Sequence, residues 1–305
     1  MASEVEIKQR VRHFYDQVGW QTTGDGLYQN ARYEDLRPVS RDYIRRCHLR
    51  VNRFLKPQGR YLLDAGSGPV QYPEYLTYSE GYEYRVCADI SIVALQEARS
   101  RLGRHGLYVV ADVANLPFKT EPFDGIVSLH TLHHLPLDEQ VKAYDEIYRV
   151  LKPGSSAVIV NGWTDSPLMR RLNWLVRGME RVGSAVARLR GRKPAAAPAA
   201  EKADQKTGQA AAAVQNTAEK KDATGTFVRK FDAAWLREQI GGKMKYEIYS
   251  WRSVSVRFLR AVIHDVTGGR LWLRLLFGLE NRWPRFFGEK GQYPLIVIRK
   301  DSSVL

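Results

Sequence analysis

The stretch RYLLDAGSGP, residues 60–69, decides the fold because it joins an apolar run to a glycine-rich turn. Asp64 ends the apolar run, and Gly66 and Gly68 follow it directly. Glycine permits backbone angles closed to other residues and lets a ligand approach the chain closely. Pro69 suits the first turn of a helix, where no amide hydrogen is needed. The stretch therefore predicts a strand, a tight turn and the start of a helix.

Apolar runs alternate with helical patterns through the first half of the chain. Fully apolar strands are typical of a parallel sheet covered on both faces, and its crossovers are right-handed. The pattern therefore predicts an α/β fold with a doubly wound, mostly parallel, Rossmann-like sheet. The predicted strands are 61–63, 84–88, 107–110, 125–129 and 157–160, joined late in the chain by 246–251 and 293–299. The predicted helices are 3–17, 41–54 (with Ser40 as N-cap), 73–78, 92–102, 137–151, 166–190, 232–240 and 256–287.

Two more acidic residues end the second and third predicted strands. Asp89 is suited to accept hydrogen bonds from the hydroxyls of a ribose, and Asp112 to receive an adenine amino group. Together with Asp64, they would line one edge of the sheet. The alternative is that each acid caps a helix. Helix capping would readily explain one such acid, but it poorly explains an acid at the end of each of three successive strands.

These segments resemble the class I S-adenosylmethionine-dependent methyltransferases, and within them the type-11 domain group. The likeness covers roughly residues 40–162. It implies a seven-stranded sheet with a helical cap or insertion, S-adenosylmethionine as cofactor and no metal site. The motifs that carry it are LDAGSG (63–68), ADIS (88–91), ADVANLPF (111–118), FDGIVS (123–128), LHHL (132–135) and RVLKPG (149–154).

The resemblance also assigns cofactor-binding residues. It implies that Gly66 and Gly68 flank the methionine part, that Asp89 holds the ribose, and that Asp112 with its neighbour frames the adenine. One departure is Val70, which stands where the third glycine is usual. The complete set expected to bind the cofactor is Asp64, Ala65, Gly66, Ser67, Gly68, Asp89, Ile90, Asp112, Val113 and His130.

A dinucleotide-dependent dehydrogenase is the competing interpretation of the glycine-rich turn. Its G-x-G-x-x-G pattern would require a third glycine at Gln71. The Leu-Pro-Phe run at 116–118 and the Leu-Lys-Pro-Gly turn at 151–154 also favour methyl transfer.

Three histidines follow the fourth predicted strand, where a proton acceptor would be useful. His130, His133 and His134 are the candidate catalytic residues, because histidine titrates near neutrality and can act as a general base. The alternative is that they only pack the loop. The Asn/Asp-Pro-Pro-Tyr motif of base or glutamine N-methylation is replaced by Ser-Leu-His-Thr at 128–131. An oxygen or carbon acceptor is therefore expected.

Composition divides the chain into five predicted segments. The aromatic N-terminal segment resembles a lid over the cofactor pocket, although an extra helix at the sheet edge is equally consistent with it. Residues 191–226 are too poor in large apolar side chains to offset ordering entropy. The predicted segments are 1–58 (lid and helices), 59–163 (cofactor-binding core), 164–190 (basic amphipathic helix), 191–226 (disordered linker) and 227–305 (completion of the sheet with a helical cap).

Charge separates the two halves. Residues 1–160 hold 20 Lys/Arg and 20 Asp/Glu, whereas residues 161–305 hold 27 and 13, the whole excess of +14. Arginines accompany apolar stripes and tryptophans at 166–193 and 270–287, which indicates an anionic membrane surface as partner. The alternative is that both stretches cap the acceptor pocket, apolar side down.

The sequence therefore predicts an enzyme that transfers a methyl group to oxygen or carbon of a small or lipid-like acceptor. One alternative is an RNA methyltransferase that uses the basic half, although nucleic acid is the less favoured partner. Another is a cofactor-binding partner subunit without turnover. Two cysteines and a polar N-terminus favour a cytoplasmic protein, peripheral at the membrane.

Overall fold

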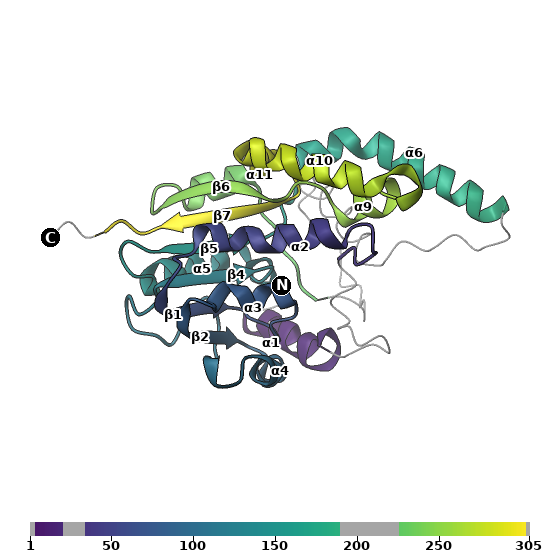
Figure 1. Cartoon of the computed structure of the whole chain (residues 1–305). Coiled ribbons are helices and arrows are strands. Elements are labelled where there is room, and N and C mark those ends of the chain that lie inside the picture. Colours follow the sequence, from purple (N-terminus) through teal and green to yellow (C-terminus); the bar gives the residue numbers. More distant parts are fainter. Residues whose placement is uncertain (1–3, 21–33, 190–225, 303–305) are drawn as a thin grey trace.

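The computed structural model describes residues 4–20, 34–189 and 226–302. Residues 191–225 of the predicted linker lie outside this range. The described residues form a seven-stranded sheet with helices on both faces (Figure 1).

The sheet is doubly wound, as the sequence predicts. Its strand order is β3-β2-β1-β4-β5-β7-β6. Neighbouring strands from β3 to β5 are parallel, and β7 runs against both β5 and β6. The chain reverses its direction of winding between β1 and β4, the position where such sheets bind ligands. The strands are β1 Gly59–Ala65, β2 Tyr82–Asp89, β3 Gly106–Val110, β4 Gly125–Leu129, β5 Ser156–Val160, β6 Lys245–Arg252 and β7 Tyr293–Arg299.

Helices cover both faces because every central strand is apolar on both sides. The α-helices are α1 Glu4–Phe14, α2 Arg41–Leu49, α3 Pro73–Leu76, α4 Ile92–Leu102, α5 Leu137–Val150, α6 Pro167–Leu189, α8 Ala233–Gln239, α9 Val256–Val262, α10 Gly269–Arg282 and α11 Pro284–Lys290. Shorter helical turns are η1 Tyr15–Gly19, η3 Arg50–Phe54, η4 Thr77–Ser79, η5 Gly103–His105, η6 Leu132–His134 and η7 Asp265–Thr267.

The core lies on the two sides of the sheet. On one side, Tyr144 of α5 and Leu236 of α8 pack against the strands and are fully buried. On the other side, Cys47 of α2 and Leu259 of α9 do the same. Cys87 of β2 is also buried, and burial raises the pKa of both thiols to about 12.

Some predicted helix boundaries are wrong. Ser40 is the N-cap residue of α2, as predicted, although its Oγ donates to Asp35 Oδ2 at 2.6 Å and makes no cap hydrogen bond. The α-helical part of this segment ends at Leu49 and tightens into the turn η3. The long helical stretch predicted at 256–287 is three helices, because the left-handed Gly268 (φ 73°) and Pro284 interrupt it.

Helix α6 divides its apolar stripe between the core and solvent. Val176 is buried, and Leu172 and Leu175 pack beside it against the α2 side of the sheet. Further along, Val182 is 56% exposed and Leu189 is 88% exposed. The first half of α6 therefore acts as a cap on the core, while its far end presents apolar side chains outward.

A buried carboxylate fastens α10 to the rest of the fold. Glu280 is 1% exposed, and its Oε2 accepts from Arg50 at 2.9 Å. Its Oε1 accepts from Tyr43 Oη at 2.7 Å and from the backbone amide of Ser253 at 2.8 Å. One side chain thus joins η3, α2 and the end of β6, so that all its buried charge is paired.

We expect Glu280→Gln to lower the free energy of unfolding by about 3 kcal/mol, because it leaves the Arg50 guanidinium buried without a counterion. Equilibrium unfolding in urea measures this change. Glu289→Gln, at an exposed position of α11, is the matched control and should change stability little. Equal stability of the two variants would contradict the structural role of Glu280.

Candidate active site

The ends of the parallel strands gather the predicted residues along one edge of the sheet. Asp89 at the end of β2 lies opposite Val110 of β3, and Leu129 of β4 lies opposite Val160 of β5. Strand β6 points the same way as β5, because β7 is antiparallel to both. The loops after β1 to β5 and the end of β6 therefore share the edge where open α/β sheets bind ligands.

The glycine-rich turn after β1 adopts backbone angles that favour glycine. Gly66 and Gly68 have φ of 75° and 53°. A Cβ on Gly66 would lie 2.1 Å from Thr131 Cγ2, so the loop after β4 packs directly on this turn. Val70 also has a positive φ, 53°, which is rare for a β-branched residue. The valine thus retains the backbone turn for which a third glycine would be usual.

Asp89 joins the turns after β1 and β2. Its Oδ2 accepts from the amide of Gly68 at 2.8 Å, and its Oδ1 accepts from the amide of Ser91 at 2.9 Å. Burial raises the pKa of Asp89 to about 6. Each carboxylate oxygen keeps a second lone pair, which can accept from a ribose hydroxyl. This geometry fits the predicted role of Asp89.

Asp64 lies beneath the turn. It is 3% exposed, and its Oδ2 accepts from Arg85 Nε at 3.1 Å as well as from Nη2. The carboxylate therefore forms a buried ion pair with β2, and its contact with a cofactor stays a prediction. Ala65 is also fully buried, whereas the partly exposed Ser67 donates from Oγ to the carbonyl of Gly68.

The end of β3 places Asp112 beside the N-terminal helix. Its Oδ1 accepts from the amide of Ala114 at 3.0 Å, and its Oδ2 forms an ion pair with Lys8 of α1. Val113 is buried next to it, while Ile90 on the neighbouring loop is partly exposed. Asp112 and Asp89 thus lie on adjacent strand ends, as predicted.

The N-terminal segment covers this edge. Trp20 lies on Gly68, with its Cη2 and Cζ2 3.0 Å from the place that a Cβ would take. Tyr15 stacks on Trp20, and its Oη hydrogen-bonds with His134 Nε2 at 2.7 Å. Asp16 also accepts from the hydroxyl of Ser91. The segment therefore occupies the approach to the glycine turn, in the position of a lid.

The three predicted histidines lie together, but burial makes them weak bases. Burial and nearby cations, including Arg252, lower the pKa of His130 to about 3. Burial also lowers the pKa of His134 to about 4 and that of His133 well below its usual value. Both ring nitrogens of His134 have partners, Tyr15 and the carbonyl of Phe227. A catalytic role for any of the three stays a prediction.

Sequence reasoning missed a second group of residues at the same edge. Trp251 and Arg252 end β6, Tyr293 begins β7 opposite Arg252, and Asn161 follows β5. His48 of α2 stacks on Trp251, with ring centroids 5.5 Å apart. These residues face the loop of His130, whose ring lies 4.9 Å from that of Trp251. Their distance along the chain, and the absence of a local motif, hide them in the sequence.

An α/β sheet with a glycine turn and acids on successive strand ends defines a nucleotide-type cofactor site. Residues 63–159 match the family model described as "Methyltransferase domain". The chain therefore carries a methyltransferase domain over these residues, as its motifs predict.

Similar curated proteins match this chain over part of its length. "Probable tRNA methyltransferase 9B" of Bos taurus is 33% identical over 133 residues, which cover 42% of this chain and 27% of that protein. "O-methyltransferase cnsE" of Penicillium expansum is 33% identical over 121 residues, 38% of this chain and 42% of that protein. The chain thus spans about a quarter of the length of the tRNA methyltransferase relatives it matches.

Solved structures agree on the fold. Phosphoethanolamine N-methyltransferase 1 of Haemonchus contortus, in complex with phosphoethanolamine and S-adenosylhomocysteine, superposes with a TM-score of 0.55 at 9% identity. That alignment covers all of this chain and 51% of the other. A S-adenosylmethionine-dependent methyltransferase of Thermotoga maritima gives a TM-score of 0.52 at 16% identity, covering 95% and 100% of the two chains.

Among the described residues, every helix is too short or too polar to cross a membrane.

Asp89 should make stability depend on pH. The pKa of Asp89 in the folded state, about 6, lies above its value in the unfolded state. Its contribution to folding stability is therefore complete below the unfolded-state pKa, and it is lost as the pH rises through about 6. We therefore expect Asp89→Asn to gain stability relative to the wild type by roughly 1 to 3 kcal/mol between pH ~4 and ~7.

Urea unfolding of the wild type and of Asp89→Asn across this pH range measures the difference in their free energies of unfolding. The contributions of the other titrating groups are the same in both proteins and cancel. Asp145→Asn, at an exposed site on α5, is the control. A difference that stays constant with pH would contradict the raised pKa of Asp89.

Proposed function

We propose that the chain binds S-adenosylmethionine at this edge and transfers its methyl group to oxygen or carbon of a small or lipid-like acceptor. The observation that carries the proposal is Asp89, a half-buried carboxylate held by the amides of both adjacent loops. When bound, the cofactor supplies a methyl group on a sulfonium. Gly66, Gly68, Asp89 and Asp112 would hold the cofactor, while the lid excludes water.

The family motif supports catalysis rather than passive binding. Transfer from a sulfonium is an in-line displacement, which depends mainly on positioning and on a dry site. Lys8, Tyr15 and Trp20 of the lid contact Asp112, His134 and the glycine turn, respectively. The lid would have to open for entry and close again for reaction.

We expect Asp89→Ala to weaken binding of S-adenosylhomocysteine about tenfold or more, because the ribose hydroxyls lose a charged acceptor. Isothermal titration calorimetry measures this affinity, with Asp145→Ala on α5 as control. Unchanged affinity would refute the site. Detection of methylated product with any acceptor would exclude the alternative that the chain is a partner subunit without turnover.

The acceptor can be lipid-like because an apolar surface covers the side of the fold above α2. Helices α6, α9, α10 and α11 lie together there (Figure 1). We call the exposed apolar face of α10 and α11 the apolar roof. It consists of Leu271, Trp272, Leu275, Leu279, Trp283 and Phe286, each between 44% and 60% exposed.

Charge on the same helices supports a membrane partner. Arg270, Arg274, Arg282 and Arg285 accompany the apolar roof on α10 and α11. Tryptophan beside arginine is typical of a membrane interface, and each basic residue near an anionic surface contributes about 1 kcal/mol. We therefore propose transient association of this face with an anionic membrane.

We expect the wild type to float with vesicles of phosphatidylserine and phosphatidylcholine, and the double variant Leu271→Ser/Trp272→Ser to float several-fold less. Both residues are exposed, so their loss removes membrane contact without opening the core. Leu107→Ser/Val110→Ser on the exposed edge strand β3 is the matched control. No flotation of the wild type would reject the membrane partner.

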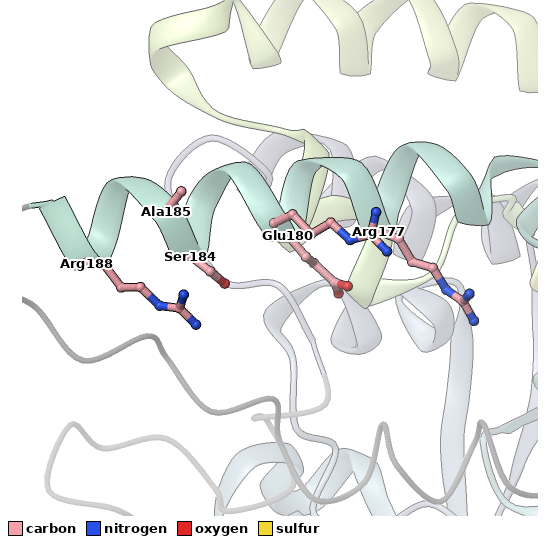
Figure 2. Close-up of a pocket in the computed structure, with 6 residues that line it drawn as sticks. Arg177, Glu180, Ser184, Ala185 and Arg188 are labelled. Atoms are coloured by element: carbon pink, nitrogen blue, oxygen red, sulfur yellow. The ribbon is translucent and has the colours of Figure 1, made fainter.

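RNA methylation is the second candidate, because several similar proteins are named as tRNA methyltransferases. A hollow of about 400 Å³ along α6 supports an anionic partner (Figure 2). Its walls include Arg177, Arg181 and Arg188, while Glu180 pairs with Arg257 at 2.7 Å. Transfer of labelled methyl groups into unmodified tRNA, without flotation on vesicles, would establish this candidate instead.

A further inference from the structure

Five buried polar atoms beside the cofactor edge lack hydrogen-bond partners within the described residues. We call their residues the polar cluster; the atoms are His48 Nε2, His130 Nε2, Asn161 Nδ2, Trp251 Nε1 and Arg252 Nε. Buried polar atoms are almost always paired, so several unpaired ones in one place require an explanation. A bound polar molecule would supply the missing partners.

The polar cluster has aromatic walls. Trp251 is fully buried and lies 5.9 Å, centroid to centroid, from Tyr293. His48 lies between the rings of Trp251 and Tyr72, at 5.5 Å and 4.6 Å from them. Arg252 lies over Tyr293, with its Cζ 4.4 Å from the ring centroid. These surroundings favour a flat molecule over a flexible or strongly hydrated one.

His48 is arranged as a proton acceptor. Its Nδ1 lies 3.3 Å from Glu74 Oε2, and because a carboxylate only accepts, Nδ1 carries the hydrogen. In the neutral ring the lone pair is then on Nε2, the atom without a partner. The hydrogen bond from His48 lowers the pKa of the Glu74 carboxyl, which keeps that carboxylate charged. Glu74 thus orients the ring so that Nε2 of His48 can accept a proton.

Arg252 supplies positive charge beside Trp251, with its Cζ 5.3 Å from the ring centroid. It is 1% exposed, and one of its terminal nitrogens pairs with Glu34, which leaves its Nε without a partner. An oxygen that becomes anionic beside this guanidinium would be stabilised by it. The weakly basic His130, whose ring lies edge to face with that of Trp251, completes the polar side.

We propose that the polar cluster is the acceptor site, that it takes a flat phenol or enol, and that His48 Nε2 removes the proton of the reacting hydroxyl. The inference rests on the proposed function and specifies the acceptor as an acidic hydroxyl. The O–H proton passes to His48, and the oxygen forms a bond to the methyl carbon. The sulfonium–carbon bond breaks with its electron pair on sulfur, and His48 later releases the proton to water.

The test uses 4-nitrophenol, whose phenolate absorbs visible light and whose phenol does not. In the presence of S-adenosylhomocysteine, the bound probe should ionise about one pH unit or more below the free probe, because His48 takes its proton beside Arg252. His48→Gln should lower the phenolate fraction at fixed pH about tenfold. The titratable groups next to His48 are Glu74, Tyr72 and Tyr75. His130 and Arg252 lie against Trp251, the ring on which His48 stacks.

Two further variants keep the test decisive. Glu74→Gln preserves the shape of the pair and should lose part of the shift, and it replaces His48→Gln if that variant does not fold. His105→Gln, whose ring contacts Ser79 outside the polar cluster, should behave as wild type. Retained binding of S-adenosylhomocysteine and retained circular dichroism show that each variant is folded.

The outcomes separate the two proposals. No binding of 4-nitrophenol, or an unchanged phenolate fraction in both His48→Gln and Glu74→Gln, would overturn the acceptor assignment while cofactor binding stands. Binding and ionisation of 4-nitrophenol by a chain that does not bind S-adenosylhomocysteine would instead overturn the proposed function.

Discussion

The common direction of the strands is the constraint on which the site depends. Because β1 pairs in parallel with both β2 and β4, the loops that follow all three emerge side by side. Thr131 Oγ1 then donates to the carbonyl of Gly66 at 3.0 Å, which locks the loop after β4 onto the glycine turn. This contact joins the two halves of the cofactor edge. Asp89 and Asp112 belong to one half, and the polar cluster belongs to the other.

The sequence was sufficient to predict the sheet and the acidic half of the edge. Apolar runs of strand length identify buried strands, and an Asp at the end of such a run is placed by the strand itself. Asp89 and Asp112 lie on adjacent strand ends for that reason. The prediction was less accurate where a side chain had a choice of partner. Ser40 takes the N-cap position but its hydroxyl bonds to Asp35, and Asp64 forms an ion pair with Arg85 that the sequence did not indicate.

The polar cluster could not be predicted, because no local pattern connects its members. His48 belongs to a helix before the first strand, whereas Trp251 and Arg252 follow it by about two hundred positions. They meet only because β6 pairs with β7 and β7 with β5, which brings the end of β6 to the cofactor edge. The lid contacts of Lys8 and Trp20 are also tertiary. Such contacts follow from topology and not from periodicity.

The burial of both cysteines has a practical consequence for studying the lid. A thiol reacts with maleimides and similar reagents as the thiolate. Cys47 and Cys87 are inaccessible, and their pKa of about 12 keeps them protonated near neutral pH. A cysteine introduced on the surface would therefore be labelled selectively without removing either native residue. Paired dyes on α1 and α10 could then report the opening of the lid in single molecules.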